Sequence, residues 1–162
     1  MFYSKTDGQY INEGQAFTID GNQYAANWLN LSTPEEKLAI GLEEVVATNS
    51  PANDIYYWVS STLDKATLTY INTPKDLAQV KTNAVSQINA TAYSILLPSD
   101  WMAVKAFETS TPIDPTWNGW RATIRTEAAN AITAINAAQD VDAVATAVQV
   151  NWTQDPKAPV SN

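Results

Sequence analysis

The spacing of hydrophobic residues changes near residue 73. Before that point, short runs alternate between apolar and polar residues or are rich in aromatic and β-branched residues, which favours β-strands. After it, apolar residues recur every three or four positions, as in amphipathic helices. The pattern predicts an α+β fold with three parts: a small antiparallel β-rich unit with one short helix over 1–72, a helical region of about four helices over 73–153, and a mobile tail over 154–162.

Turn and cap residues mark the elements of the first unit. Ala16–Ala25 is centred on Asp20-Gly21, which predicts a hairpin. Thr33-Pro34-Glu35-Glu36 has a cap residue, a proline for the first helical position and a glutamate at the capping-box offset, so it predicts a short helix that stops at Gly41. Three more extended segments are predicted, the last two as a second hairpin: Leu42–Ala47, Ile55–Val59 and Thr67–Ile71.

Two long apolar stripes organise the helical region. Thr73-Pro74-Lys75-Asp76 predicts the start of the first helix, Pro98 its end, and Ser99-Asp100 the cap of a second helix that runs to the loop Thr109–Pro115. A last, shorter helix is expected from Asp140 to Trp152. The first stripe is Leu77, Val80, Ala84, Ile88, Ala92 and Ile95, and the second is Trp117, Trp120, Ile124, Ala128, Ala131 and Ile135.

Composition then removes most classes of function. The chain has no cysteine and no histidine, which excludes disulfides, thiolate nucleophiles, imidazole bases and the usual zinc sites. A formal charge of −8 is the opposite of what binding to nucleic acid or to an anionic membrane requires. The amino terminus lacks a continuous apolar run, so neither a secretory signal nor a membrane span is expected there and the protein should stay where it is made. A protein partner or a small ligand remains.

Carboxylates and glycines offer no catalytic pattern. Glu35/Glu36 and Glu43/Glu44 are adjacent in sequence, so each pair points to different sides of its element and cannot share a site. Asp140 and Asp142 lack the spaced loop of a calcium site. No phosphate-binding or nucleophile-elbow motif is present among only five glycines. The sequence therefore predicts a non-enzyme without a cofactor or metal.

One constellation combines aromatic rings with charge, and it supplies the candidate partner-binding residues. The chain's only two arginines lie close to two tryptophans and stand four residues apart. Tryptophan and arginine are over-represented in interface hot spots, but tryptophans can also fill a helical core while the arginines pair locally with Glu108 or Asp100. Both interpretations stay open. The candidates are Asp100, Trp101, Trp117, Trp120, Arg121 and Arg125.

The two interpretations predict different mutational effects. If the Trp120 ring lies in the core, Trp120→Ala should lower stability by several kcal/mol, on the order of other large-to-small core changes. If the arginines lie on a partner surface, Arg121→Ala and Arg125→Ala should leave folding intact and weaken the capture of a partner.

Two blocks of the sequence resemble bacteriophage tail fibre assembly and tail assembly chaperone proteins. The first runs Leu96-Leu97-Pro98-Ser99-Asp100-Trp101 and then Ile113 to Arg125, similar to an "LxxTDW" element followed by a proline loop and a "W..YR..LR" helix; Ser99 stands for the usual Thr and Trp120 for the usual Tyr. The second contains Asn27-Trp28-Leu29, Ser32 to Glu36 and Ile40-Gly41-Leu42, similar to "P.NWL" and "S.EE…LGI", with Ala26 in place of the proline. Together they cover about half the chain.

The resemblance implies a phage-encoded, non-enzymatic factor that helps a tail or tail-fibre protein fold, trimerise or assemble in the host cytoplasm. An exposed aromatic patch would hold the client, or the β-rich unit would add a strand to it. The main alternative is a structural virion component, such as a tail, baseplate or fibre-adaptor subunit. A third class, an Asp/Glu-dependent hydrolase, would need a cleft with two converging carboxylates. The sequence leaves the client and the oligomeric state open, and a homo-oligomer is compatible with it.

Overall fold

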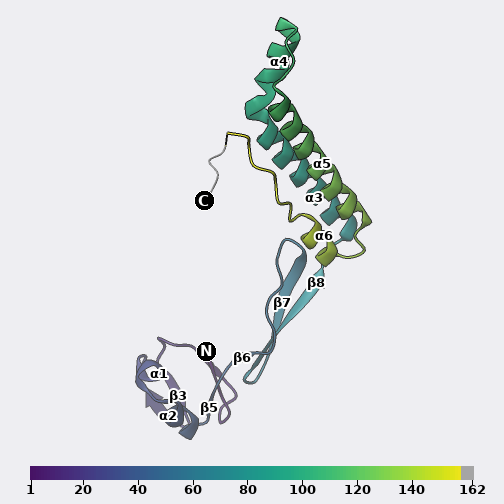
Figure 1. The fold of residues 1–162 in the computed structure, drawn as a ribbon. Helices are drawn as coiled ribbons and strands as arrows, with labels where there is room; N and C mark the ends of the chain where they lie inside the picture. The colour runs from purple at the N-terminus through teal and green to yellow at the C-terminus, as the bar shows by residue number, and fades with distance from the viewer. Residues whose placement is uncertain (158–162) are drawn as a thin grey trace. The chain divides into compact units, whose positions relative to one another are not determined.

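The computed structural model describes residues 1–157, and the chain divides into two compact units, one of residues 1–73 and one that begins at Pro74 (Figure 1). Mostly antiparallel strands and short helices make up the first unit, and helices make up the second. The predicted α+β fold is therefore confirmed.

A small sheet opens the first unit. Strand β1 (Phe2–Ser4) lies between β2 (Tyr10–Ile11) and β5 (Leu42–Glu44), antiparallel to both, with Phe2 opposite Ile11. Neither β1 nor β2 was expected, because two- and three-residue strands are too short to show a period. The sheet brings the amino terminus of the chain to the strand predicted after Gly41.

The first predicted hairpin is confirmed. Strands β3 (Phe17–Ile19) and β4 (Asn22–Tyr24) pair in antiparallel register around Asp20 and Gly21, which have φ of 49° and 75°. Positive φ at both central residues gives the backbone twist that a two-residue hairpin favours. The rings of Phe17 and Tyr24 stack across the strands with centroids 5.0 Å apart.

Two short helices follow the hairpin, where one was expected. Helix α1 (Trp28–Leu31) was missed because a single turn has no apolar period, and its Trp28 ring packs edge-on against Tyr24 at 4.9 Å. Helix α2 (Pro34–Ala39) has the predicted capping box: the Glu36 N–H donates to Thr33 Oγ1 at 3.2 Å, and the Thr33 N–H donates to the Glu36 carboxylate at 2.8 Å. Two orphan amide donors are thereby satisfied.

The chain leaves α2 through Gly41, as predicted. Its φ is +80°, and a Cβ at this position would lie 3.0 Å from Thr6 Oγ1, so only glycine fits without displacing a neighbour. The elements of the first unit then enclose one small core. It consists of Phe2, Ile11, Ile19, Leu29 and Leu42. Leu29 of the Asn27-Trp28-Leu29 motif is thus a core residue rather than a surface residue.

A second sheet in the same unit has the strand order β6-β8-β7: β6 (Val46–Ala47), β8 (Thr67–Pro74) and β7 (Tyr57–Asp64). The second hairpin is confirmed, with Lys65 at φ 50° in its turn, but its first strand begins two residues later than predicted and both strands end later. Strand β6 pairs with β8 in parallel. A helix start at Thr73-Pro74 is wrong, because Pro74 ends β8 and the Asp76 carboxylate caps the helix, accepting from the Gln79 N–H at 2.8 Å.

Up to residue 157, the second unit contains four α-helices and one 3-10 turn. They are α3 (Leu77–Leu96), the turn η1 (Leu97–Ser99), α4 (Asp100–Thr109), α5 (Pro115–Ala137) and α6 (Val141–Ala147). Helices α3 and α5 lie side by side, and α6 packs against both near the end of α5 (Figure 1). Most members of both predicted stripes are buried where these helices meet: Val80, Ala84, Ile88 and Ala92 on α3, and Trp120, Ile124, Ala128, Ala131 and Ile135 on α5.

The chain after α6 differs from expectation. Asp140 caps α6 as predicted, accepting from the Ala143 N–H at 2.7 Å, but the helix ends at Ala147 and does not reach Trp152. The following residues are not helical and run back along α5 (Figure 1). Of the tail expected to be mobile, 154–157 belong to this segment, and 158–162 lie outside the described residues.

Within residues 1–157, no helix combines the length and the apolar character needed to cross a lipid bilayer.

The contact between α3 and α5 should dominate the stability of the helical unit. Ile124 is fully buried, so Ile124→Ala should reduce the free energy of unfolding by about 2–5 kcal/mol. Ile132→Ala, on the half-buried side of the same helix, is the matched control and should cost less. Urea denaturation followed by far-UV circular dichroism measures both. Equal losses for the two variants would contradict this packing.

Candidate partner-binding site

The guanidinium of Arg121 joins α5 to the junction between α3 and α4. Arg121 is 5% exposed, and its Nη1 donates to the Leu96 carbonyl at 3.1 Å and to Ser99 Oγ. Its Nη2 donates to Asp100 Oδ1 at 2.7 Å. We call these four residues the Arg121 clamp. The predicted local pairing of an arginine with Asp100 is therefore confirmed for Arg121.

Ser99 belongs to the clamp and does not cap α4 through its side chain. Its hydroxyl is buried, donates to the Leu96 carbonyl at 2.7 Å and accepts from Arg121. The expected hydrogen bond from the α4 amides to this side chain is absent, so that part of the prediction is wrong. The hydroxyl instead closes the turn η1, which sets the direction in which α4 leaves α3.

The two tryptophans of α5 take different positions. Trp120 is 7% exposed, and its indole N–H donates to the Thr153 carbonyl at 3.0 Å, so this ring belongs to the core. Trp117, one turn earlier, is half-buried and meets Trp120 edge-to-face with centroids 5.5 Å apart. Because one ring supports the other, Trp117 is held in place while part of it stays accessible.

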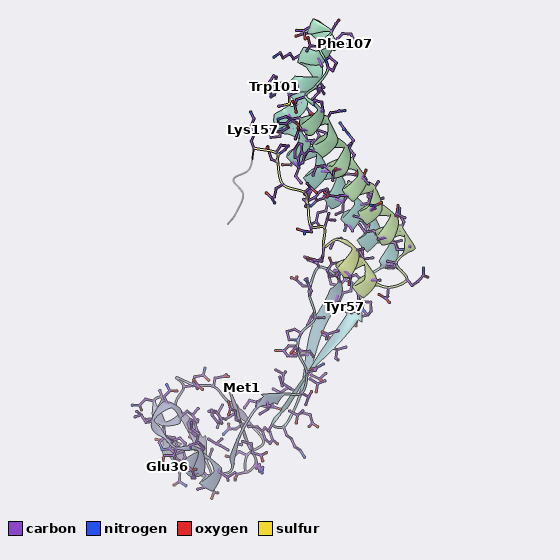
Figure 2. All side chains as sticks on the ribbon, in the orientation of Figure 1. Met1, Glu36, Tyr57, Trp101, Phe107 and Lys157 are labelled. Carbon is purple, nitrogen blue, oxygen red and sulfur yellow. The ribbon has the colours of Figure 1, made fainter. Side chains whose placement is uncertain are left out.

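The extended segment after α6 reaches the same end of α5. Glu127 accepts from both the backbone N–H of Thr153, at 3.1 Å, and its hydroxyl, at 2.5 Å. Further along, the Lys157 ammonium lies 5.7 Å from the centre of the Trp117 ring. Figure 2 shows Lys157 and Trp101 at the same end of the helical unit.

A groove of about 200 Å³ lies between α4, the loop that follows it and the first turn of α5. We call it the α4 groove. Its apolar walls are Trp101, Met102, Ala106, Pro112, Ile113 and Trp117, and Lys105 and Asp114 add charge to its lining.

Helix α4 itself is poorly covered. None of its ten residues is buried. Trp101, on the groove, is 56% exposed, while Phe107 is 90% exposed and Val104 is also exposed (Figure 2). At helical spacing, Val104 and Phe107 lie opposite the groove face, so α4 presents apolar side chains on two sides. Exposed apolar surface of this kind is typical of contact sites.

Both charged groups of the groove interact with other groups of the chain. The Asp114 carboxylate caps α5, accepting from the Thr116 and Trp117 amides at 3.0 and 3.4 Å. The Lys105 ammonium lies 5.9 Å from the centre of the Trp101 ring. Among residues 1–157, no group of three or more acidic residues is placed to hold a metal ion. The groove is thus equipped to bind apolar side chains.

Five of the six candidate residues meet at this end of the helical unit: Asp100, Trp101, Trp117, Trp120 and Arg121. Arg125 does not join them and is exposed on α5. Val104, Phe107 and Ile113 were not among the candidates. Val104 and Phe107 belong to a short helix with apolar residues on several sides, which a one-sided stripe does not describe, and Ile113 lies in the loop after it.

The chain matches no protein-family model, no curated protein and no solved structure in the comparisons made with them. Its function is therefore inferred from the motifs described above and from the geometry of the α4 groove.

Burial of Arg121 changes the mutational expectation for the two arginines. Arg121→Ala leaves the Leu96 carbonyl and the Ser99 hydroxyl without their arginine donor and Asp100 without its cation. We therefore expect the free energy of unfolding to fall by about 1–3 kcal/mol. Because the Asp100 side chain is 45% exposed, water screens part of the ionic loss. Arg125→Ala, at an exposed position, should stay within about 0.5 kcal/mol of the parent. Thermal unfolding checks both, and an unchanged midpoint for Arg121→Ala would contradict the clamp.

Proposed function

We propose that this protein is a phage tail or tail-fibre assembly chaperone that binds its client through α4 and the α4 groove and makes or breaks no bond. Two lines of support converge. The motifs that resemble tail assembly chaperones include Asp100, Trp101 and Trp117, and these residues lie in or beside the groove. The observation that carries the proposal is that α4 leaves all ten of its residues without full burial.

Apolar burial would provide the binding energy. Each square ångström of apolar surface removed from water contributes roughly 25 cal/mol, so large aromatic side chains such as Trp101 and Phe107 contribute most. A client segment with one or two apolar side chains fits the size and lining of the groove. The outer side of α4 offers Val104 and Phe107 to a second part of the same client.

The charge of the protein suits a factor that keeps an apolar surface exposed. Seventeen acidic residues against nine basic ones make copies of the chain repel one another. This repulsion opposes aggregation through α4 while the groove is empty. We place the protein in the host cytoplasm, where tail-fibre chains are synthesised.

Removing the exposed rings should abolish capture of the client without unfolding the chain. We expect Trp101→Ala combined with Phe107→Ala to weaken co-purification with the tail-fibre protein of the same phage by at least about tenfold, since each ring loses well over 1 kcal/mol of contact. Trp58→Ala is the matched control, because Trp58 is an exposed tryptophan, 67% accessible, in the other unit. Equal capture by the double variant and the parent would overturn the α4 site.

The fate of the protein in the particle separates a chaperone from a structural component. We expect mass spectrometry of purified virions to find no stoichiometric copies, and deletion of the gene to leave misfolded or missing fibres. Stoichiometric copies in the virion would instead assign the same surface to a permanent tail, baseplate or fibre-adaptor contact.

A further inference from the structure

Strand β7 forms one edge of the β6-β8-β7 sheet. Among residues 1–157, β8 is the only strand that pairs with it. A two-residue turn, Lys65-Ala66, joins β7 to β8, so alternate residues of β7 direct their backbone N–H and C=O groups away from β8. By this geometry, Val59, Ser61 and Leu63 form the outer edge. A long edge strand without proline is a template for pairing with another strand.

No residue of this sheet is fully buried. This holds for all eighteen residues in its strands of two, eight and eight residues. Sheets of this size gain independent stability when an apolar face is packed against something. Val59 and Leu63 alternate on one face of β7 and are 38% and 37% exposed. Extra strands would enlarge this face and supply partners for the open edge.

The low charge of this sheet allows a second copy of this chain to be the occupant. Residues 1–73 contain nine acidic and three basic residues, so most surfaces of the first unit repel each other. Asp64 is the only charged residue in the three strands of the sheet. Two copies can therefore approach through β7 with little like-charge repulsion.

We propose that β7 pairs antiparallel with β7 of a second copy, about a two-fold axis that passes through the sheet at Ser61. In this register Ser61 faces Ser61 of the second copy, Val59 faces Leu63, and Ser60 faces Thr62. Apolar residues thus meet apolar residues and hydroxyls meet hydroxyls, which is the pairing that stabilises neighbouring strands. The result is a continuous six-stranded sheet with Val59 and Leu63 of both copies on one face.

The register also separates the two copies of the strand's only charge. Each Asp64 lies about six residues along the strand from its counterpart, roughly 20 Å at 3.4 Å per residue. That separation exceeds the Debye length of about 8 Å at physiological salt. The dimer does not depend on the client or on the α4 groove, so its test is independent of the test of the proposed function.

A charge exchange at Ser61 tests the two-fold axis. Ser61→Lys and Ser61→Glu each place two like charges opposite one another, so each variant alone should dimerise at least about tenfold more weakly than the parent in sedimentation equilibrium. Mixed together, the two variants should form a heterodimer, because opposite charges then meet. A monomeric parent across the concentration series, dimers of both single variants, or a mixture that stays monomeric would each overturn the proposal.

A crosslink provides a readout that does not require weakening the interface. The chain has no cysteine, so Ser61→Cys introduces a single thiol, and a hydrogen-bonded antiparallel pair sets its two Cα atoms about 5.5 Å apart, within disulfide range. Mild oxidation should convert most of this variant to a covalent dimer. Ser94→Cys, an exposed serine on α3, is the matched control and should form no covalent dimer, although its β7 edge still pairs. Equal crosslinking of both variants, or capture of a client strand by a monomeric β7 edge, would overturn the proposal.

Discussion

The hydrogen bonds of the Arg121 guanidinium determine how the helical unit ends. One planar group donates to the Leu96 carbonyl, to the Ser99 hydroxyl and to the Asp100 carboxylate, which belong to η1 and the start of α4. A lysine ammonium could not reach the three acceptors with the same fixed geometry. Helix α4 packs little against α5. The Arg121 clamp therefore sets the direction of α4 and keeps the α4 groove open.

The aromatic residues of this region divide between structure and surface. Trp120 is buried and bonded to Thr153, and it supports the half-buried Trp117. Trp101 and Phe107 remain exposed on α4. This division reconciles the two interpretations that the sequence left open, since a core ring and a contact ring can lie one turn apart. It also means that Arg121, the arginine nearest the rings, stabilises the fold, and the proposed binding site consists of apolar side chains.

Structure that depends on neighbouring residues was predicted well, and contacts between distant residues were not. The capping box at Thr33, the turn at Asp20-Gly21 and the helical stripes are each specified by residues within one element, so they could be read from the chain. Burial of Arg121 and the inward hydroxyl of Ser99 depend on groups more than twenty residues apart along the chain. The parallel pairing of β6 with β8 similarly depends on a distant partner. Of the candidate site, five residues were found, but Val104, Phe107 and Ile113 were missed, and so was the division of the rings between core and surface.

Hydrogen exchange of the chain, alone and with its tail-fibre client, measures the central claim directly. A chaperone that works through α4 predicts slower amide exchange over residues 100–117 when the client is present, with exchange in α6 unchanged, since α6 lies at the other end of the α3–α5 pair (Figure 1). A bound client that leaves exchange across α4 and the start of α5 unaltered would contradict the account.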